Sequence, residues 1–227
     1  MLFKPSLFSF LLLLLAVCCY AQETLVVDSS YANGYYRQRV LFFSQMPHLK
    51  KEIVFLGNSI TEAGEWQELI PNRRVKNRGI SGDVTYGILD RLDEVLASKP
   101  SKIFILIGVN DLKRGTPVDT IAATYRRIVE KIKASSPKSS LYIQSVLPVN
   151  EAMLSGAYKK VSNAMINALN EKLVQLAVQS KCVYADVHSI MKDENGQLAK
   201  ELTNDGIHLW PSTYIRWVNY LKEKKYL

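Results

Sequence analysis

Cysteine and histidine are scarce in this sequence of 227 residues, which contains three of each. Two of the cysteines, Cys18 and Cys19, lie near the N-terminus, and Cys182 stands alone in the rest of the chain. The sequence has no Cys-pair or His-pair spacing of the kind that binds zinc, so we expect no metal site and no cofactor. Cys182 begins an apolar run, and we expect it to be a small buried residue and not a nucleophile.

A long hydrophobic run occurs only near the N-terminus, from Leu7 to Val17, after Lys4. It is shorter than the roughly 20 residues that cross a bilayer, so we expect no stable membrane span. We interpret residues 1–21 as a cleaved secretory signal, and we expect an exported protein in the periplasm or outside the cell. The alternative is lipid attachment at Cys18, because the three residues before it partly resemble a lipobox.

Acidic residues are outnumbered, with 21 Asp and Glu against 29 Lys and Arg, for a formal net charge of +8. The basic residues are scattered along the chain and form no stripe interleaved with aromatic residues, so we expect no binding to nucleic acid. The chain is long enough for one well-buried domain, and it is too short for two ordinary domains with a linker. Nothing in the sequence specifies an oligomeric state.

Short β-branched runs alternate with segments of helical period over most of the chain. Residues 22–50 are interpreted as an N-terminal extension, in which residues 36–43 form a helix that packs an aromatic face onto the domain. The domain itself covers residues 51–227. Its expected strands are residues 53–56, a short run around Val75, and residues 103–107, 141–147 and 182–187. Its expected helices include residues 88–96, 121–132, 161–176 and 214–221.

This alternation predicts right-handed crossovers and a parallel sheet covered by helices on both faces. The expected fold is therefore α/β, a flavodoxin-like three-layer α/β/α sandwich with a parallel sheet of about five strands. In an open sheet of this kind, functional residues gather at the carboxyl ends of the strands. Three polar motifs follow expected strands, and a fourth precedes the last expected helix.

Ser59 follows the first expected strand, in Gly57-Asn58-Ser59-Ile60-Thr61, at the beginning of a helix. A serine hydroxyl is a poor nucleophile until a base takes its proton. His208 is the best candidate for that base, because Asp205 stands three residues before it and can orient the imidazole, as a catalytic triad requires. The other two histidines are expected to be a surface residue and a packed residue. The alternatives are a helix-capping serine and an Asp-Gly turn with an incidental histidine.

Gly79 and Asn110 lie in the motifs that follow the second and third expected strands. A glycine brings a backbone N–H close to a ligand, and the asparagine amide is a second donor. Together with the N–H of Ser59 they would form an oxyanion hole. Each motif alone is also compatible with ordinary turn chemistry. All four together predict an acyl-transfer site.

The four motifs resemble those of the SGNH hydrolases, also called the GDSL esterase/lipase family. The resemblance covers about residues 51–227. It implies a flavodoxin-like fold, a triad of Ser59, Asp205 and His208, and an oxyanion hole from Ser59, Gly79 and Asn110. Asn58 departs from the family pattern, which has Asp at that position. The central part of the chain is especially similar to bacterial sialate O-acetylesterases and to platelet-activating-factor acetylhydrolases.

Together with the expected export, the resemblance implies a secreted serine esterase that removes a short acyl group, typically acetyl, from a small-molecule or glycan ester such as O-acetylated sialic acid. The substrate wall is expected to include Asn58, Tyr86, Asn150 and Tyr158. A lysophospholipase or short-chain lipid esterase is the first alternative. A catalytically silent binding protein on the same fold is the second.

Overall fold

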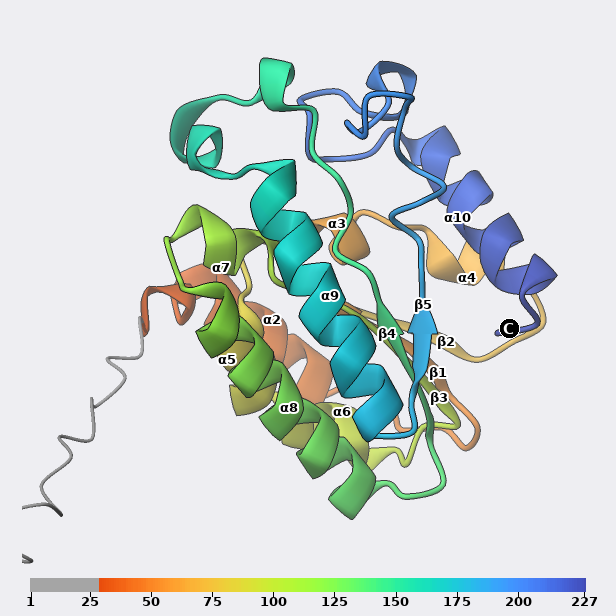
Figure 1. Cartoon of the computed structure of the whole chain (residues 1–227). Helices are drawn as coiled ribbons and strands as arrows, with labels where there is room; N and C mark the ends of the chain where they lie inside the picture. The colour runs from red at the N-terminus through yellow and green to blue at the C-terminus, as the bar shows by residue number, and fades with distance from the viewer. Residues whose placement is uncertain (1–28) are drawn as a thin grey trace, which may run out of the picture.

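Five parallel strands form the centre of the structure (Figure 1). This computed structural model describes residues 29–227, and the predicted secretory signal at 1–21 and the alternative lipid-attachment site at Cys18 lie outside them. The strands lie in the order β2-β1-β3-β4-β5, and every neighbouring pair is parallel. Their bounds are β1 Ile53–Gly57, β2 Val75–Gly79, β3 Lys102–Leu106, β4 Ser140–Gln144 and β5 Val183–Ala185. The predicted parallel sheet is confirmed.

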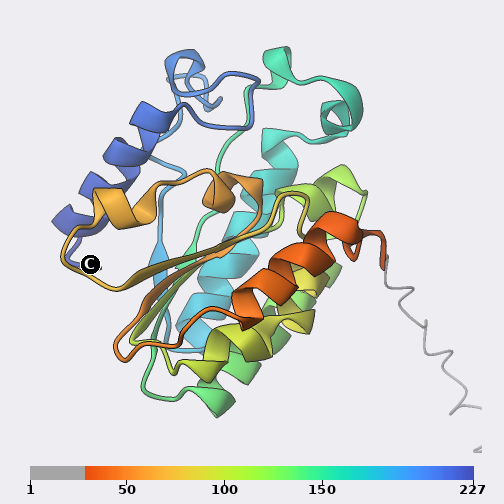
Figure 2. The same ribbon diagram turned by 180° about the vertical axis from the view of Figure 1, so that it is seen from behind.

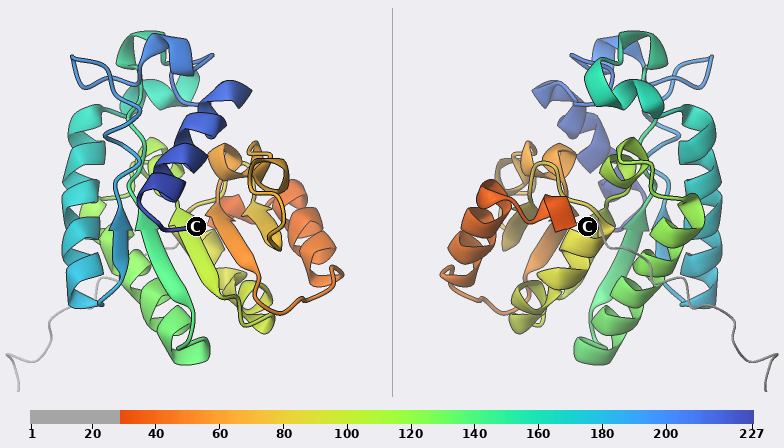
Figure 3. Two further views of the ribbon diagram at one scale, coloured as in Figure 1. Left: turned by 90° about the vertical axis from the view of Figure 1, so that its right-hand side faces the viewer. Right: turned by 90° about the vertical axis from the view of Figure 1, so that its left-hand side faces the viewer.

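Helices cover both faces of this sheet and complete three layers (Figures 1 and 3). Helices α5, α6, α8 and α9 lie on one face, and α4 and α10 lie on the other. The α-helices are α2 Gly34–Ser44, α3 Ser59–Glu62, α4 Trp66–Leu69, α5 Thr85–Asp90, α6 Leu92–Ala97, α7 Val109–Lys113, α8 Val118–Ser135, α9 Asn163–Gln179 and α10 Pro211–Glu223. Short 3₁₀ turns are η1 Ser29–Tyr31, η2 Glu151–Met153, η3 Gly156–Lys160 and η4 Lys200–Leu202. The predicted three-layer sandwich is confirmed.

A stack of aromatic rings runs across three adjacent strands. The ring of Phe104 on β3 lies 4.9 Å from Phe55 on β1 and 4.4 Å from Tyr142 on β4. Trp66 of α4 stacks on Phe55 at 4.0 Å, and Trp217 of α10 meets the edge of Trp66 at 5.2 Å. Large buried rings contribute much apolar contact area. These contacts join α4 and α10 to this face of the sheet.

The helix expected over residues 88–96 is two helices, α5 and α6, and the break falls at Arg91. The guanidinium of Arg91 is buried and donates to Asp83 Oδ2 at 2.9 Å. It also donates to the carbonyl oxygens of Gly57 at 3.1 Å and Arg78 at 2.8 Å. The apolar period continues through the break, so the sequence pattern did not reveal it. Arg91 thereby ties the ends of β1 and β2 together.

Helix α2 lies beside α6 on the outside of the sandwich (Figure 2). Asn33 caps it by accepting from the N–H of Tyr36 at 3.0 Å. Tyr36 and Phe43 are buried, and the Tyr36 hydroxyl donates to the carbonyl oxygen of Gly87 at 2.8 Å. The helix expected over residues 36–43 is thus present and packs through aromatic residues. The domain boundaries at residues 22, 50 and 51 remain predictions.

Candidate active site

Ser59 is the first residue of α3, directly beyond the carboxyl end of β1. The chain approaches β3 closely here, because a Cβ at Gly57 would lie 2.4 Å from the carbonyl oxygen of Leu106. The side-chain oxygen of Asn58 accepts from the N–H of Ile60 at 3.0 Å and caps the short helix. These contacts fix the turn, and they leave Ser59 half-buried at the edge of the sheet.

His208 reaches Ser59 from the loop before α10. Its Nε2 lies 3.0 Å from Ser59 Oγ, and its Nδ1 lies 2.6 Å from Asp205 Oδ2. Partial burial alone would raise the pKa of Asp205, but hydrogen bonds from the His208 ring and from the N–H groups of His208 and Ile207 outweigh it and hold that pKa below its ordinary value. Asp205 therefore stays ionised and can orient the imidazole, while Nε2 faces the serine hydroxyl.

The loop that carries this pair is closed by its own hydrogen bonds. Thr203 Oγ1 donates to the carbonyl oxygen of His208 at 2.7 Å and accepts from the N–H of Gly206 at 2.9 Å. Gly206 has a φ of +87°, and a Cβ there would lie 2.7 Å from the carbonyl oxygen of Asn150. The position therefore favours glycine for both its backbone conformation and its close contact.

Asn150 joins two loops of the site. Its N–H donates to the carbonyl oxygen of Gly206 at 2.9 Å, and its side-chain nitrogen donates to the carbonyl oxygen of Leu198 at 2.9 Å. The backbone of Asn150 thus holds the loop that carries His208, and its side chain holds the segment of Leu198. One amide hydrogen and the side-chain oxygen remain, and a contact between Asn150 and substrate stays a prediction.

Asn110 lies at the beginning of α7 and is fully buried. Its side-chain Nδ2 donates to the carbonyl oxygen of Asp83 at 3.0 Å, and its Oδ1 accepts from the Tyr158 hydroxyl at 2.8 Å. An asparagine amide nitrogen carries two hydrogens, so one remains after the bond to Asp83. That remaining hydrogen can be donated to an oxyanion.

Gly79 does not offer the free backbone donor that the sequence analysis assigned to it. Its N–H already donates to the side-chain oxygen of Asn77 at 2.9 Å. A Cβ at Gly79 would lie 2.2 Å from the backbone nitrogen of Glu62. The assignment is corrected on these grounds, because Gly79 allows β2 to end tightly against α3.

Gly82, three residues later, is the better candidate for that donor. It has a φ of +81°, it is partly exposed, and its N–H has no acceptor among residues 29–227. Its two neighbours are tied to the site, since the N–H of Ser81 donates to Glu62 Oε2 at 2.8 Å and the carbonyl oxygen of Asp83 accepts from Asn110. The motif contains two glycines, and the sequence alone did not indicate which of them faces the site.

Glu62 is a residue that the sequence analysis missed. It ends α3, and its carboxylate accepts from the N–H and hydroxyl of Ser81 on one side. On the other side it accepts from the Tyr35 hydroxyl and lies 3.3 Å from Arg39 Nε, both on α2. Glu62 therefore joins α2, α3 and the loop of Gly82. No local pattern marks it, because its partners are distant in the sequence.

The other expected substrate residues have different places. Asn58 is 0% exposed and caps α3, so the assignment of a substrate contact to it is corrected. Tyr158 lies in η3, and its hydroxyl is bonded to Asn110. Tyr86 lies partly exposed in the first turn of α5. A contact between Tyr86 and substrate stays a prediction.

The other two histidines lie away from the serine hydroxyl. His48 is exposed in the segment before β1. His188 is buried, its Nδ1 lies 3.0 Å from the carbonyl oxygen of Val146, and burial lowers its pKa. His208 is thus the histidine positioned to act as a base on Ser59.

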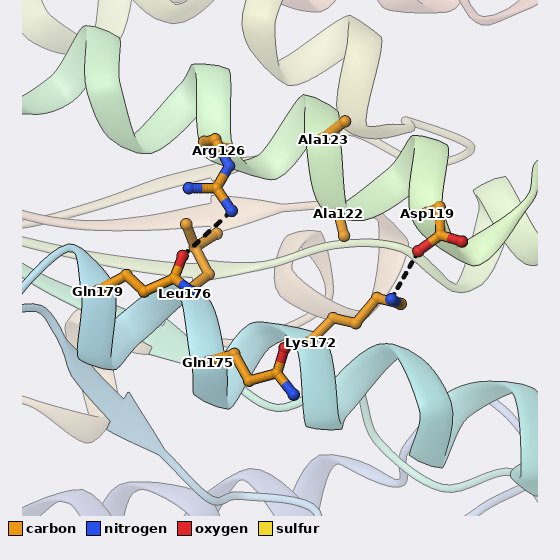
Figure 4. A pocket seen from close by; sticks show the side chains of 8 residues that line it. All are labelled: Asp119, Ala122, Ala123, Arg126, Lys172, Gln175, Leu176 and Gln179. Atoms are coloured by element: carbon orange, nitrogen blue, oxygen red, sulfur yellow. Dashed lines mark hydrogen bonds and ion pairs between the residues drawn. The ribbon is translucent and has the colours of Figure 1, made fainter.

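A surface groove between α8 and α9 belongs to a different part of the molecule (Figure 4). Figure 4 shows two polar contacts across it, from Lys172 to Asp119 at 2.6 Å and from Arg126 to Gln179 at 3.1 Å. None of its lining residues comes from the loops that carry the nucleophile or the base. These contacts join the two helices, and the groove adds nothing to the chemistry at Ser59.

Two further findings concern residues 29–227. No cluster of three His, Cys, Asp or Glu side chains in this range is arranged to hold a metal ion. No helix within the same range has the length and apolar character needed to cross a bilayer.

Comparison with known proteins finds a family whose sequence pattern matches most of this chain. Residues 55–214 match the GDSL-like lipase/acylhydrolase family. The chain is 27% identical over 128 residues to an N-acylneuraminate cytidylyltransferase of Streptococcus agalactiae serotype V, which covers 56% of this chain and 29% of that protein. The chain thus spans 29% of the length of this relative.

Two other similarities extend over more of both partners. The platelet-activating factor acetylhydrolase IB subunit alpha2 of Rattus norvegicus is 25% identical over 178 residues, 76% of this chain and 75% of that protein. A solved structure from Streptococcus pneumonia, described as a platelet activating factor, superposes with a TM-score of 0.78 and 30% identity. That superposition covers 84% of this chain and 92% of the other.

Proposed function

The chain belongs to the GDSL-like lipase/acylhydrolase family and is a carboxylic ester hydrolase, and on that premise we propose that Ser59, His208 and Asp205 remove an acetyl group from a carbohydrate ester. The observation that carries the proposal is the continuous contact from Ser59 Oγ through His208 to Asp205, at 3.0 Å and 2.6 Å. Nucleophile, base and orienting acid are within hydrogen-bond distance of one another.

The reaction has two halves. Ser59 Oγ attacks the ester carbonyl carbon while His208 Nε2 takes the hydroxyl proton, which gives a tetrahedral oxyanion. His208 returns that proton to the oxygen of the leaving alcohol as the ester bond breaks, and acetyl-Ser59 remains. Water then attacks this acyl group with His208 again as the base, and acetate leaves as Ser59 regains its proton.

The oxyanion is held by the backbone N–H groups of Ser59 and Gly82 and by the side-chain Nδ2 of Asn110. Support for this set comes from the free N–H of Gly82 and the second amide hydrogen of Asn110. Removing one such donor typically costs about 3 kcal/mol of transition-state stabilisation. The Gly82 and Asn110 donors are held by neighbouring backbone and side-chain groups before substrate arrives, and such preorganisation makes donors of this kind effective.

The leaving alcohol is proposed to be a sugar hydroxyl. Two names support this choice: one relative is an acetylhydrolase, and another is an N-acylneuraminate enzyme. Export of the protein through residues 1–21 is part of the same proposal, because it would place the enzyme where glycans are found.

A short-chain lipid ester is the second candidate, and the platelet-activating factor acetylhydrolase relative favours it. A lipid chain would need apolar side chains in the loop after β4, where Met153, Leu154 and Tyr158 are the candidates, but fewer of them are accessible than the sequence suggests. Leu154 is buried in the core at 6% exposure, which leaves Met153 and Tyr158 partly exposed in the loop after β4.

The test is acetate release from 9-O-acetyl sialic acid and an acetylated xylan oligomer, together with fatty-acid release from a lysophospholipid. Ser59→Ala and His208→Ala serve as blanks, and each should lower kcat by at least about 10⁴-fold without unfolding the protein. Serine-dependent hydrolysis of a sugar ester supports the proposed substrate class. Hydrolysis of the lysolipid alone replaces that class with the second candidate. Full activity in either blank refutes the triad.

A further inference from the structure

Asn110 depends on a distant residue for the orientation of its amide. Its Oδ1 accepts from the hydroxyl of Tyr158, which lies in η3 and is 48 residues further along the chain. The amide is fully buried, so rotation by 180° would bring Oδ1 toward the carbonyl oxygen of Asp83. Two facing acceptors are unfavourable. The Asp83 carbonyl oxygen and the Tyr158 hydroxyl therefore fix the amide together, and the second hydrogen of its nitrogen is left for the oxyanion.

Lys113 contacts both the hydroxyl and the ring of Tyr158. It is one turn beyond Asn110 on α7, and its Nζ lies 3.5 Å from the Tyr158 hydroxyl and 4.5 Å from the centre of the ring. Within residues 29–227 no carboxylate forms an ion pair with this ammonium group. Burial, and then the charge of Arg114, lowers the pKa of Lys113. An ammonium group without a carboxylate partner exerts its field on the nearby dipoles.

The Tyr158 hydroxyl is suited to remain a donor. Burial, and then the negative charge of Asp205, raises its pKa above the ordinary value for tyrosine. The hydroxyl oxygen faces the Lys113 ammonium while the hydroxyl hydrogen points to Asn110 Oδ1. Hydrogen bonds arranged in series polarise one another. The series ends at the Asn110 amide, whose second hydrogen is the one assigned to the oxyanion.

We propose that Tyr158 and Lys113 are positioning residues of the oxyanion hole, and that they orient and polarise the Asn110 amide toward the transition state. The inference rests on the proposed function, in which Asn110 binds the oxyanion. The charge on the substrate oxygen exists in the transition state and not in the ester, so the pair acts on kcat and leaves KM nearly unchanged.

The first variant is Tyr158→Phe, assayed with p-nitrophenyl acetate. It keeps the ring and its contact with Lys113 and removes only the hydroxyl. We expect kcat to fall about tenfold, KM to stay within about twofold, and affinity for a boronic acid that forms a tetrahedral adduct with Ser59 to fall with kcat. Tyr142→Phe is the matched control, because Tyr142 lies on β4 against Phe104 and away from the site.

The second variant is Lys113→Met, which should lower kcat about threefold to tenfold, with recovery in Lys113→Arg. Lys131→Met changes the net charge equally on α8, where Lys131 pairs with Asp93 at 2.9 Å, and serves as its control. In the double variant with Tyr158→Phe, most of the Lys113 effect should be absent, because the connecting hydroxyl is already gone.

Three results would overturn the inference: a kcat for Tyr158→Phe within twofold of the parent, a change confined to KM, or additive effects in the double variant. A purely structural role for Tyr158 predicts a lower Tm and a higher KM in place of the kcat effect. These outcomes leave the triad intact if Ser59→Ala is inactive. Hydrolysis that survives in Ser59→Ala refutes the proposed function itself, and the role of the pair with it.

Discussion

Replacement of Arg91 by Met should be among the most damaging single changes to stability in this protein. The Arg91 side chain is 1% exposed, its partner Asp83 is 0% exposed, and the two are joined at 2.9 Å. The guanidinium also donates to two backbone carbonyl oxygens at the ends of β1 and β2. Arg91→Met retains much of the side-chain volume, but it leaves a buried carboxylate without its cation.

The expected loss is roughly 4 kcal/mol, the middle of the range for breaking one partner of a buried ion pair. For a chain of this size that corresponds to a fall in Tm of about 8–16 °C. Burial raises the pKa of Asp83 to about 6 even with Arg91 present. In the variant that pKa should rise further, because the neighbouring positive charge is gone.

The sign of the pH dependence follows from this. At pH 5 the Asp83 carboxyl of the variant can be protonated and neutral at little cost. At pH 8 folding must either bury the ionised carboxylate without its cation or take up a proton, and the free-energy cost of taking up a proton increases with pH. The loss of stability should therefore be larger at pH 8 than at pH 5. Urea unfolding at both pH values measures it, with the exposed Arg127→Met as control. The double variant Arg91→Met/Asp83→Asn should regain part of the loss. A loss below about 1 kcal/mol at pH 8 would refute the reasoning.

Three further predictions concern the site and its neighbours. Asp205→Asn should lower kcat by about 10⁴-fold in the acetate assay, with little change in Tm, because the imidazole loses its orienting acceptor. Gly79→Ala should lower Tm because its Cβ meets Glu62 backbone, whereas Gly82→Ala, with open space but a φ of +81°, should lower kcat more than stability. Burial raises the pKa of Asp111, the neighbour of Asn110, to about 7. The contribution of this carboxyl to stability therefore falls as pH rises from about 4 to 7, and Asp111→Asn should remove that contribution from the pH dependence measured by urea unfolding.

The sheet and the place of the nucleophile could be predicted because both depend on local patterns. Short apolar runs bounded by turns predicted all five strands. Their parallel direction follows from the helices that connect successive strands. Parallel strands bring their carboxyl ends to one edge. Ser59 and Asn110, just beyond the ends of β1 and β3, could therefore be placed at the same edge, and the structure adds that these two strands are adjacent.

The choice between Gly79 and Gly82 could not be made in the same way. Both glycines are in the motif Asn77-Arg78-Gly79-Ile80-Ser81-Gly82-Asp83, and both are compatible with a turn after β2. What separates them is whether the N–H is already bonded, and that depends on the Asn77 side chain and on how α3 packs against β2. Sequence periodicity carries no information about such contacts.

Arg91 and Asn150 show a second limit. A charged residue within a helical apolar pattern is expected to face solvent. Arg91 is buried instead, because its guanidinium donates to Asp83 and to two backbone carbonyl oxygens. For Asn150 the sequence predicts only a substrate contact, and it does not reveal that the side chain also donates to the carbonyl oxygen of Leu198. The hydrogen-bond partners of Arg91 and Asn150 come from distant segments, so they depend on tertiary packing and cannot be inferred from local sequence patterns.

The contacts of Glu62 connect the N-terminal helix to the chemistry. Its carboxylate is bonded to Ser81, the residue before Gly82, and to Tyr35 on α2. Asn110, on the opposite side of the same hole, is held by Tyr158 from η3. The Asn110 amide also donates to the carbonyl oxygen of Asp83, so both oxyanion donors beyond the nucleophile are fixed partly by contacts between motifs and partly by residues outside them. The motifs supply the reacting groups, and α2 and η3 add contacts that help to fix the orientation on which electrostatic preorganisation depends.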